Sequence, residues 1–226
     1  MLWGIDYTSH DPIIHQLAPS ENYQAYSAFF QSLKKMNYPL DVLVCDECES
    51  LIYAAKFHYP KVKIQLCLNH IKEGIRRSLQ SRTNPTHEHF VKQIEYLFRQ
   101  KTIYEYSKYA RKLLKEHSSN VVYQNILREL NNKHEFLIRH LIDRRAPATN
   151  NLIESFNSHL EARVRSIKGF ESFNSAMLWL NAYVMNRRLS KFTDCRGKFK
   201  HLNRTTPIAH TAMYDAIKVS LLKKVK

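Results

Sequence analysis

Asp46 is an acidic residue whose position in the sequence suggests chemistry. It closes the segment DVLVCD at 41–46, which is short, nearly all apolar and typical of a strand buried on both faces. Open α/β sheets bind ligands at the carboxyl ends of their strands, so an acidic residue here is a candidate site residue. Asp46 could instead cap a helix expected from about Glu49, a common role for Asp between a strand and a helix. Position alone leaves both interpretations open.

Glu154 is a second candidate, in the string TNNLIESFNSHLEARVRS at 149–166. The string predicts a helix with Glu154 in its first turn, and Glu154, Asn157 and Glu161 recur on one face of that helix. A Glu near a helix N-terminus is also stabilised by the helix dipole without any further role. Taken alone, Glu154 favours this second interpretation.

Cys67 and His70 are three residues apart, close enough for both side chains to reach one ion or one backbone turn. Together with Cys45 and Cys48 they give Cys-x2-Cys, eighteen residues, then Cys-x2-His, a spacing that zinc sites allow. Against zinc, Cys45 is expected inside a buried strand beside Asp46, where successive side chains point to opposite faces. A zinc knuckle normally needs a free loop, so this set of four ligands is the alternative interpretation.

The elements expected over residues 1–70 would position these side chains. The apolar and β-branched segments LWGID and PIIHQLAP, joined by the polar turn YTSHD, predict a hairpin. A helix is expected from about Glu21 to Lys35, because aromatic and leucine side chains recur there at helical spacing. The segments DVLVCD, ESLIYAAKFHYP and VKIQLCL then follow in the order strand, helix, strand, which predicts a parallel crossover.

From about Ile71 to His140 the sequence contains repeated helical patterns and no convincing strand. Asn84 and Pro85 are expected to separate the first two of these helices. The expected organisation is a core over 1–70, an all-helical insertion over 71–145, returning core helices over 146–190, and a basic tail with a helix over 191–226.

The returning segment begins after the polar break RRAPATNN, with a long helix starting near Leu152 and Asn150 or Asn151 as its N-cap. Gly169 is expected to end or kink that helix, before a further helix in ESFNSAMLWLNAYVMNRR. Pro207 is expected to open a last amphipathic helix.

Charge and composition restrict the class of protein. The chain has 226 residues, 44% of them apolar, and 35 Lys and Arg against 20 Asp and Glu give a formal charge of +15. A globular domain with basic residues spread along the chain favours a polyanion partner, although charge does not distinguish DNA from RNA, and a ribosomal or membrane-surface protein could show the same balance. The four glycines are too dispersed for a dinucleotide fingerprint or a P-loop, so a nucleotide cofactor is not expected.

The sequence predicts a soluble, unsecreted protein that does not enter a membrane. No apolar segment approaches the roughly 18–20 residues that span a bilayer, and the first residues do not resemble a secretory signal. Four unevenly placed cysteines indicate cytosolic thiols. We therefore expect a cytoplasmic protein.

Read together, these positions resemble the Mutator-like and related bacterial insertion-sequence transposases, which use an Asp, Asp, Glu triad. VLVCDECESLIYAAKFHYPKVKIQLCLNHI resembles the family's second catalytic strand and its Cys-x2-His motif, and TNNLIESFNSHLEARVRSIKGFES resembles its third motif. In the family these blocks flank an all-helical insertion, and here Asp46 and Glu154 are 108 residues apart with helical patterns between them. The resemblance implies an α/β fold: an incomplete ribonuclease-H-like mixed sheet with a large helical insertion.

Carried over to this sequence, the resemblance makes Asp46 the second catalytic carboxylate and Glu154 the third, with Cys67 and His70 in a supporting role. LWGIDYTSHDPIIHQLAPSENYQAY resembles the family's second and third strands, so the strand with the first carboxylate is expected to be missing and the chain to be N-terminally truncated. An enzyme without that carboxylate would be impaired or inactive. The alternative is that Asp6 is the first carboxylate.

The implied reaction is DNA cleavage and strand transfer by two Mg²⁺ or Mn²⁺ ions held roughly 3.5–4 Å apart by carboxylate oxygens. The implied partners are transposon ends and target DNA, with a homo-oligomer in full-length relatives and a nucleoid-associated location in a prokaryote. The basic segments available for phosphate contacts are KKMN, IKEGIRRSLQSR, ARVRSIK, NRRLSK and RGKFKHLNR.

Two other functions remain open from the sequence. One is a noncatalytic nucleic-acid-binding module with a zinc knuckle built from Cys45, Cys48, Cys67 and His70. The other is a helical scaffold whose basic surface serves only solubility. Zinc lost on thiol modification would favour the module, carboxylate-dependent Mn²⁺ binding would favour the enzyme, and failure to bind duplexes at low salt would favour the scaffold.

Overall fold

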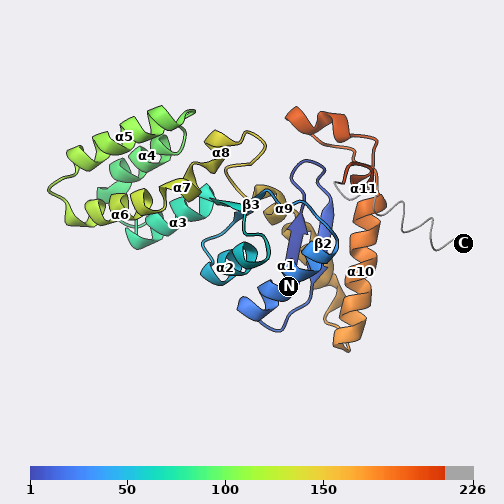
Figure 1. Cartoon of the computed structure of the whole chain (residues 1–226). Coiled ribbons are helices and arrows are strands. Elements are labelled where there is room, and N and C mark those ends of the chain that lie inside the picture. The colour runs from blue at the N-terminus through green and yellow to red at the C-terminus, as the bar shows by residue number, and fades with distance from the viewer. Residues whose placement is uncertain (212–226) are drawn as a thin grey trace, which may run out of the picture. The chain divides into compact units, whose positions relative to one another are not determined.

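A computed structural model of the protein describes residues 1–211, and their contacts divide the chain into two compact units (Figure 1). Of the described residues, unit 1 contains 1–40, 49–61 and 151–211, whereas unit 2 contains 41–48 and 62–150. Each unit therefore takes segments from more than one part of the sequence. Over residues 1–211, no helix has the length and apolar character required to cross a membrane.

The predicted hairpin is confirmed in unit 1, where β1 (Leu2–Ile5) pairs antiparallel with β2 (Pro12–Gln16). Gly4 lies opposite Ile14, and a Cβ atom at Gly4 would lie only 2.7 Å from Cγ2 of Ile14. Only glycine therefore fits this strand position without displacing its partner. The register shifts between Gly4 and Ile5, just before the turn that carries Asp6.

Two helices of unit 1 pack against each other, α1 (Tyr23–Lys35) and α2 (Glu49–His58). The Asn22 side chain accepts a 3.0 Å hydrogen bond from the Ala25 amide, which caps α1 and fixes its first residue. Most of the predicted aromatic and leucine face of α1 is buried, with Tyr23 at its start exposed, and small residues at 54 and 55 let α2 approach closely. Apolar burial on these two faces stabilises the pair.

The long helices α9 (Asn151–Ile167) and α10 (Phe173–Leu189) complete unit 1. Lys168 and Gly169 have positive φ angles of 57° and 117°, so Gly169 ends α9 as predicted. The Phe156 ring of α9 meets the Trp3 ring of β1 edge to face, with centroids 5.0 Å apart. These contacts join the N-terminal hairpin to a helix about 150 residues later in the sequence.

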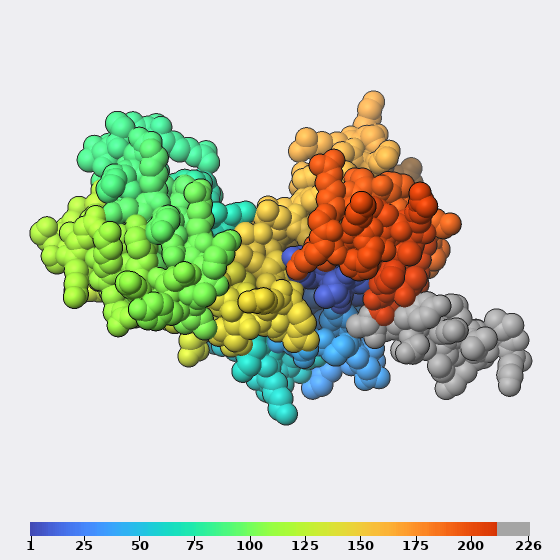
Figure 2. Space-filling view, turned by 90° about the horizontal axis from the view of Figure 1, so that it is seen from above, coloured from blue at the N-terminus to red at the C-terminus, as the bar shows by residue number. Residues whose placement is uncertain are grey.

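The segment after α10 contacts the hairpin turn of the same unit. It contains η2 (Gly197–Leu202) and the short α11 (Pro207–His210). The Phe199 ring lies 5.2 Å from the Tyr7 ring and 4.3 Å from the His10 ring, so this segment lies against the N-terminal residues (Figure 2, red against deep blue). Pro207 opens α11 as predicted, and the rest of the expected last helix falls outside the described residues.

Unit 2 contains the predicted parallel pair, β3 (Val42–Cys45) and β4 (Lys63–Leu66). Gln65 of β4 is fully buried and joins the strand to the helices beyond it. Its Nε2 donates to the Leu137 carbonyl at 3.3 Å, and its Oε1 accepts from the His140 amide at 2.8 Å. A buried amide with both of its functional groups bonded fixes this junction.

The other elements of unit 2 are helical. They are α3 (Leu68–Ser78), η1 (Pro85–His87), α4 (Glu88–Leu97), α5 (Ile103–Glu116), α6 (Val121–Asn132), α7 (His134–Leu137) and α8 (Arg139–Ile142). Asn84 caps η1, so the predicted break at Asn84 and Pro85 is confirmed. The Phe90 and Tyr123 rings are buried in the core of these helices and stack in parallel, with centroids 4.0 Å apart.

The four strands pair two by two. Within residues 1–211 the hydrogen bonds form two two-stranded sheets, β1–β2 and β3–β4, and the single mixed sheet stays a prediction. The contacts also divide the expected core of residues 1–70, because α2 packs on α1 whereas β3 pairs with β4, which contacts α7 and α8. The chain is thus mixed α/β and mostly helical, with small sheets.

Candidate functional site

The end of the parallel strand pair in unit 2 brings three of the predicted site residues together. Asp46 directly follows β3, and Cys67 directly follows β4. Because Cys45 is in register with Leu66, the residues after both strands emerge at the same edge of the sheet. Cys67 is also the N-cap residue of α3, and His70 lies one turn later on the same face. The spacing of three residues therefore places both side chains beside Asp46.

Asp46 is held by two donors. Nδ1 of His70 lies 2.6 Å from Oδ1 of Asp46, and Nδ2 of Asn150 donates to the same oxygen at 2.7 Å. The structure gives Oδ2 of Asp46 no hydrogen bond within the described residues. One oxygen thus orients the carboxylate, and the other remains available for a ligand.

Asn150 connects the carboxylate to the thiol. Its Oδ1 accepts a hydrogen bond from Sγ of Cys67 at 3.0 Å while its Nδ2 donates to Asp46. The backbone fixes this arrangement, since the Cys67 amide donates to the Cys45 carbonyl at 2.8 Å and the Leu68 amide donates to the Ala148 carbonyl at 3.0 Å. The polar segment before α9 is thereby held against the start of α3. Sequence reasoning assigned Asn150 only a capping role.

Exposure differs among the three residues. The side chains of Asp46 and His70 are 52% and 44% exposed, whereas Cys67 is fully buried. A contact this exposed contributes little to stability, about 0–1 kcal/mol even for a charged pair, so we interpret its role as orientation. The buried thiol forms the floor of a site whose other two side chains reach solvent.

Asp46, Cys67 and His70 also form a set of metal-ligand types. One ligand atom from each lies within 4.8 Å of the others. In residues 1–211, neither Cys45 nor Cys48 belongs to this group. Burial and nearby acidic groups raise the pKa of Cys45 to about 12, which disfavours the thiolate that zinc requires. The four-ligand zinc knuckle stays a prediction that this environment does not favour.

Asp6, the alternative first carboxylate, lies in unit 1 and is already fully engaged. Oδ1 accepts hydrogen bonds from the Thr8 amide at 2.7 Å, the Thr8 hydroxyl at 2.6 Å and the Ser9 amide at 2.9 Å. Oδ2 accepts a hydrogen bond from the hydroxyl of Tyr38. Burial by itself would raise the pKa of Asp6, but these hydrogen bonds outweigh burial and lower it. This arrangement is typical of a carboxylate that holds a turn.

A second buried carboxylate, which sequence reasoning missed, ends the same turn. Asp11 is completely buried and pairs with Arg188 of α10, whose Nε and Nη2 donate to its two oxygens at 2.8 and 2.7 Å. The Arg188 side chain is 12% exposed. No local pattern indicates this pair, because its members are 177 residues apart.

Glu154 lies in unit 1, in the first turn of α9 as predicted. Its side chain is exposed, and its backbone carbonyl accepts a 3.0 Å hydrogen bond from the Ser158 hydroxyl. Asn157 and Glu161 follow on the same continuous helix, so the predicted polar face is present. Glu161 pairs with Arg165 at 3.5 Å.

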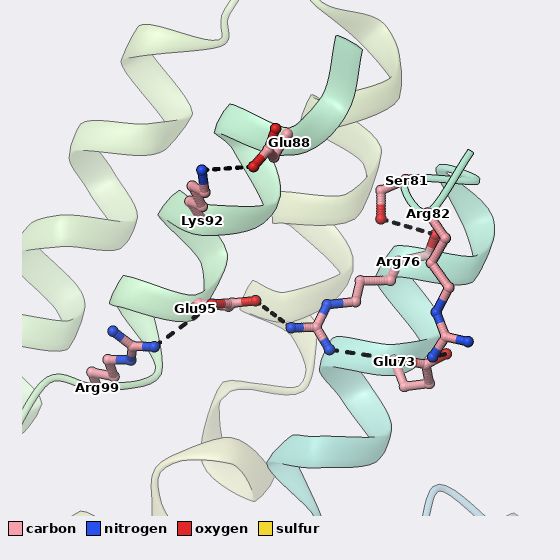
Figure 3. A network of polar contacts seen from close by, with 8 residues as sticks. All are labelled: Glu73, Arg76, Ser81, Arg82, Glu88, Lys92, Glu95 and Arg99. Atoms are coloured by element: carbon pink, nitrogen blue, oxygen red, sulfur yellow. Dashed lines mark hydrogen bonds and ion pairs between the residues drawn. The ribbon is translucent and has the colours of Figure 1, made fainter. Parts of the chain in front are cut away.

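Several basic side chains of the helical region are paired with acids. Figure 3 shows Arg76 between Glu73 and Glu95, with Arg99 on the other oxygen of Glu95. Arg82 pairs with Glu73 at 2.9 Å, and Lys92 pairs with Glu88 at 2.7 Å. The charges of the basic segment IKEGIRRSLQSR are thus partly neutralised within the unit. Arg77 of the same segment is exposed and, among the described residues, takes no part in these ion pairs.

The comparisons with known proteins agree with the motifs. The family model described as Transposase, Mutator family, matches residues 4–191, which include Asp46, Cys67, His70 and Glu154. A search of curated proteins found no match. The matched region covers most of the sequence and spans both units. The chain belongs to the Mutator family of transposases.

Proposed function

We propose that this chain is the catalytic portion of an insertion-sequence transposase that cleaves DNA and transfers strands by a two-metal mechanism. Transposases act on DNA, so family membership gives the class of partner. The proposal adds the reaction, the metal ions and the residues that bind them, and places the protein on the DNA of a prokaryotic nucleoid.

The observation that carries the proposal is the state of the Asp46 carboxylate. His70 and Asn150 hold it through one oxygen, which leaves the other for a hard cation. Asp46 lies at the carboxyl end of a parallel strand, where α/β sheets place their ligands. Asp6 and Asp11, by contrast, have both oxygens engaged by protein donors.

We propose a ribonuclease-H-like fold for the core. Such a mixed sheet would include one antiparallel and one parallel pair, and β1–β2 and β3–β4 are two such pairs. The helical elements between residues 71 and 145 agree with an insertion between the second and third motifs.

Carboxylate oxygens of Asp46 and Glu154 would bind the Mg²⁺ or Mn²⁺ ions. These ions would activate a water or 3′-hydroxyl and stabilise the leaving oxygen during an in-line attack on a phosphodiester. His70 and Asn150 would orient Asp46, and Cys67 would hold Asn150. Because Asp6 is committed to its turn, a third carboxylate is not assigned, and we expect weak activity.

A Mn²⁺-dependent plasmid-nicking and strand-transfer assay tests the proposal. We expect Asp46→Asn and Glu154→Gln each to lower activity about 100-fold or more, because each removes an oxygen ligand of the ions. Asp41→Asn, at the other end of β3, and Glu161→Gln, two turns along α9, are matched controls and should retain activity.

Direct Mn²⁺ binding provides a second readout where turnover is weak. Calorimetry should show Mn²⁺ binding that Asp46→Asn and Glu154→Gln abolish and that the two controls preserve. Equal activity and equal Mn²⁺ affinity in all five proteins would contradict the proposed role of these carboxylates.

Arg76 and Arg77 are neighbours in the sequence, and we expect their substitution to affect DNA binding differently. Arg77→Gln is expected to weaken duplex binding and to reduce the slope of log affinity against log salt by about 1, because an unpaired guanidinium can replace a phosphate counterion. Arg76→Gln should leave that slope unchanged, since Glu73 and Glu95 already neutralise Arg76. A salt titration of fluorescence anisotropy measures both, and the same slope for both variants would refute the assignment.

A further inference from the structure

We propose that Asp46, Cys67 and His70 form a binding site for a single Zn²⁺ ion, with a fourth position open to solvent. This ligand set differs from the four-ligand knuckle, because Asp46 replaces both Cys45 and Cys48. Zinc binding does not depend on the proposed function, although its expected effect on catalysis does.

The chemistry of the donors selects the ion. Thiolate sulfur and imidazole nitrogen are ligands of Zn²⁺ and Co²⁺, whereas Mg²⁺ and Mn²⁺ prefer oxygen. A hard ion at Asp46 would therefore gain little from Cys67 and His70. A borderline ion would gain a sulfur, a nitrogen and an oxygen ligand from side chains that are already together.

The geometry fits a tetrahedral ion after a small movement. Bond lengths of about 2.0–2.3 Å place neighbouring ligand atoms of a tetrahedral zinc site about 3.3–3.6 Å apart. The three ligand atoms here lie within 4.8 Å of one another, and Nδ1 of His70 lies 2.6 Å from Oδ1 of Asp46. Opening that hydrogen-bonded pair by less than about 1 Å would admit the ion. Both side chains are half exposed, so a small rotation of either one would not disrupt a packed core.

Binding requires only the loss of protons. The Cys67 thiol, which donates to Oδ1 of Asn150, would release its proton to solvent and become the thiolate ligand. The Nδ1 proton that His70 donates to Asp46 would leave for solvent, and the neutral ring, protonated at Nε2, would bind through Nδ1. Nδ2 of Asn150 would continue to donate to Asp46 and so orient the carboxylate from outside the ligand set.

The open position has a structural basis. Cys67 is buried and anchored by its own amide and by that of Leu68, whereas Asp46 and His70 reach solvent. Three protein ligands with one solvent-facing position are characteristic of exchangeable or reactive zinc sites, and four are characteristic of structural ones. We therefore expect reversible zinc binding that is not needed for folding.

Bound zinc would affect the proposed nicking reaction. Zinc on Asp46 would occupy the carboxylate that the Mg²⁺ or Mn²⁺ ions require. Zn²⁺ is therefore expected to inhibit Mn²⁺-dependent nicking, and Cys67→Ser should reduce the fractional inhibition measured against the zinc-free nicking of the same variant.

Cobalt titration of the full chain tests the site directly. With one equivalent of Co²⁺ we expect the visible absorption of tetrahedral cobalt together with a thiolate charge-transfer band, and one equivalent of Zn²⁺ should abolish both. The thiolate band separates this site from zinc on other histidines, of which the chain has 12 in total. Competition with a chromophoric chelator gives the zinc affinity.

Variants assign the ligands. Cys67→Ser should abolish the thiolate band, and Asp46→Asn and His70→Asn should each weaken zinc binding by at least about 100-fold. Asn150→Ala should weaken it by about 10–100-fold, as expected for a residue that orients a ligand. Cys48→Ser and Cys195→Ser are cysteine controls that should change nothing. Circular dichroism should show that each variant retains the helical signal of the parent.

Three outcomes would overturn the proposal: no thiolate band in the parent chain, a band that survives Cys67→Ser, or a band that Cys48→Ser removes. The last result would indicate the four-ligand knuckle instead. Mn²⁺ binding separates this inference from the proposed function. Mn²⁺ affinity that depends on Asp46 but not on Cys67 would support the enzyme even where zinc fails to bind, and a thiolate band without Mn²⁺ binding would support the zinc site alone.

Discussion

Replacing Arg188 with methionine is expected to lower the free energy of unfolding of unit 1 by about 3–5 kcal/mol. Arg188 is the bidentate partner of Asp11, which is completely buried. Without the guanidinium, the Asp11 carboxylate would remain in the interior with neither a counter-charge nor donors for its oxygens. Such a charge must be neutralised or solvated by partial unfolding, and either process destabilises the native state.

Urea denaturation monitored by tryptophan fluorescence measures this effect in unit 1. Both tryptophans, Trp3 in β1 and Trp179 in α10, belong to unit 1. Arg187→Met is the matched control: Arg187 is exposed and adjacent to Arg188, and its replacement should change the free energy of unfolding by less than about 1 kcal/mol.

A double variant separates the cost of an unpaired charge from a loss of packing. Replacing Asp11 by leucine together with Arg188→Met should recover much of the stability, because an apolar pair of similar volume removes the buried charge. Equal losses in the Arg187 and Arg188 single variants, or a double variant no more stable than Arg188→Met, would contradict this account of the pair.

Local sequence patterns were sufficient to predict the elements that carry the site. The apolar segments before Asp46 and Cys67 became β3 and β4, and the residues after them emerge at one edge because the strands are parallel. The spacing of Cys67 and His70 predicted that both side chains could reach one ion or one backbone turn, and the first turn of α3 brings them together. These features depend on periodicities of two and 3.6 residues, which can be read from a short stretch of sequence.

Contacts between distant segments were not predictable in the same way. Asn150 meets Asp46 across 104 residues, and Arg188 meets Asp11 across 177. The polar string before α9 identified Asn150 only as a helix cap, since a capping preference depends on neighbours in sequence. Its second role depends on where the helical insertion returns the chain, which is set by packing among many side chains.

The turn that contains Asp6 was predictable only in part. The string YTSHD, which follows Asp6, indicated a turn. An Asp side chain at the start of a turn commonly accepts hydrogen bonds from the backbone amides two and three positions later. Those bonds to Thr8 and Ser9 are present. The hydrogen bond from Tyr38 was not predictable, because it comes from the loop after α1. It is this fourth donor that leaves neither oxygen of Asp6 unengaged.

Asp6→Ala is therefore expected to destabilise unit 1 by about 3–5 kcal/mol, because it leaves the donors of Thr8, Ser9 and Tyr38 without their acceptor. Asp6→Asn retains one acceptor oxygen and an amide that the Tyr38 hydroxyl can accept from, so it should cost about 1–2 kcal/mol. Urea denaturation with tryptophan fluorescence measures both changes. The exposed Asp194 of the same unit provides the control, since Asp194→Ala should change stability by less than about 0.5 kcal/mol.

The pH dependence of stability tests the same contacts through charge. The pKa of Asp6 is lowered in the folded protein from its ordinary value of 3.8, so the unfolded chain binds the proton more tightly than the folded chain does. The stabilisation from ionised Asp6 is then fully present above pH 3.8 and is lost as the pH falls through the lower folded pKa. The stability difference between the parent and Asp6→Asn should accordingly shrink on acidification, and a difference that stays constant between pH 7 and pH 2.5 would contradict it. Activity then distinguishes a structural carboxylate from a metal ligand. If the Asp6→Asn protein folds and retains Mn²⁺-dependent nicking, Asp6 serves to hold the turn; if it folds and has lost nicking, Asp6 is the first carboxylate.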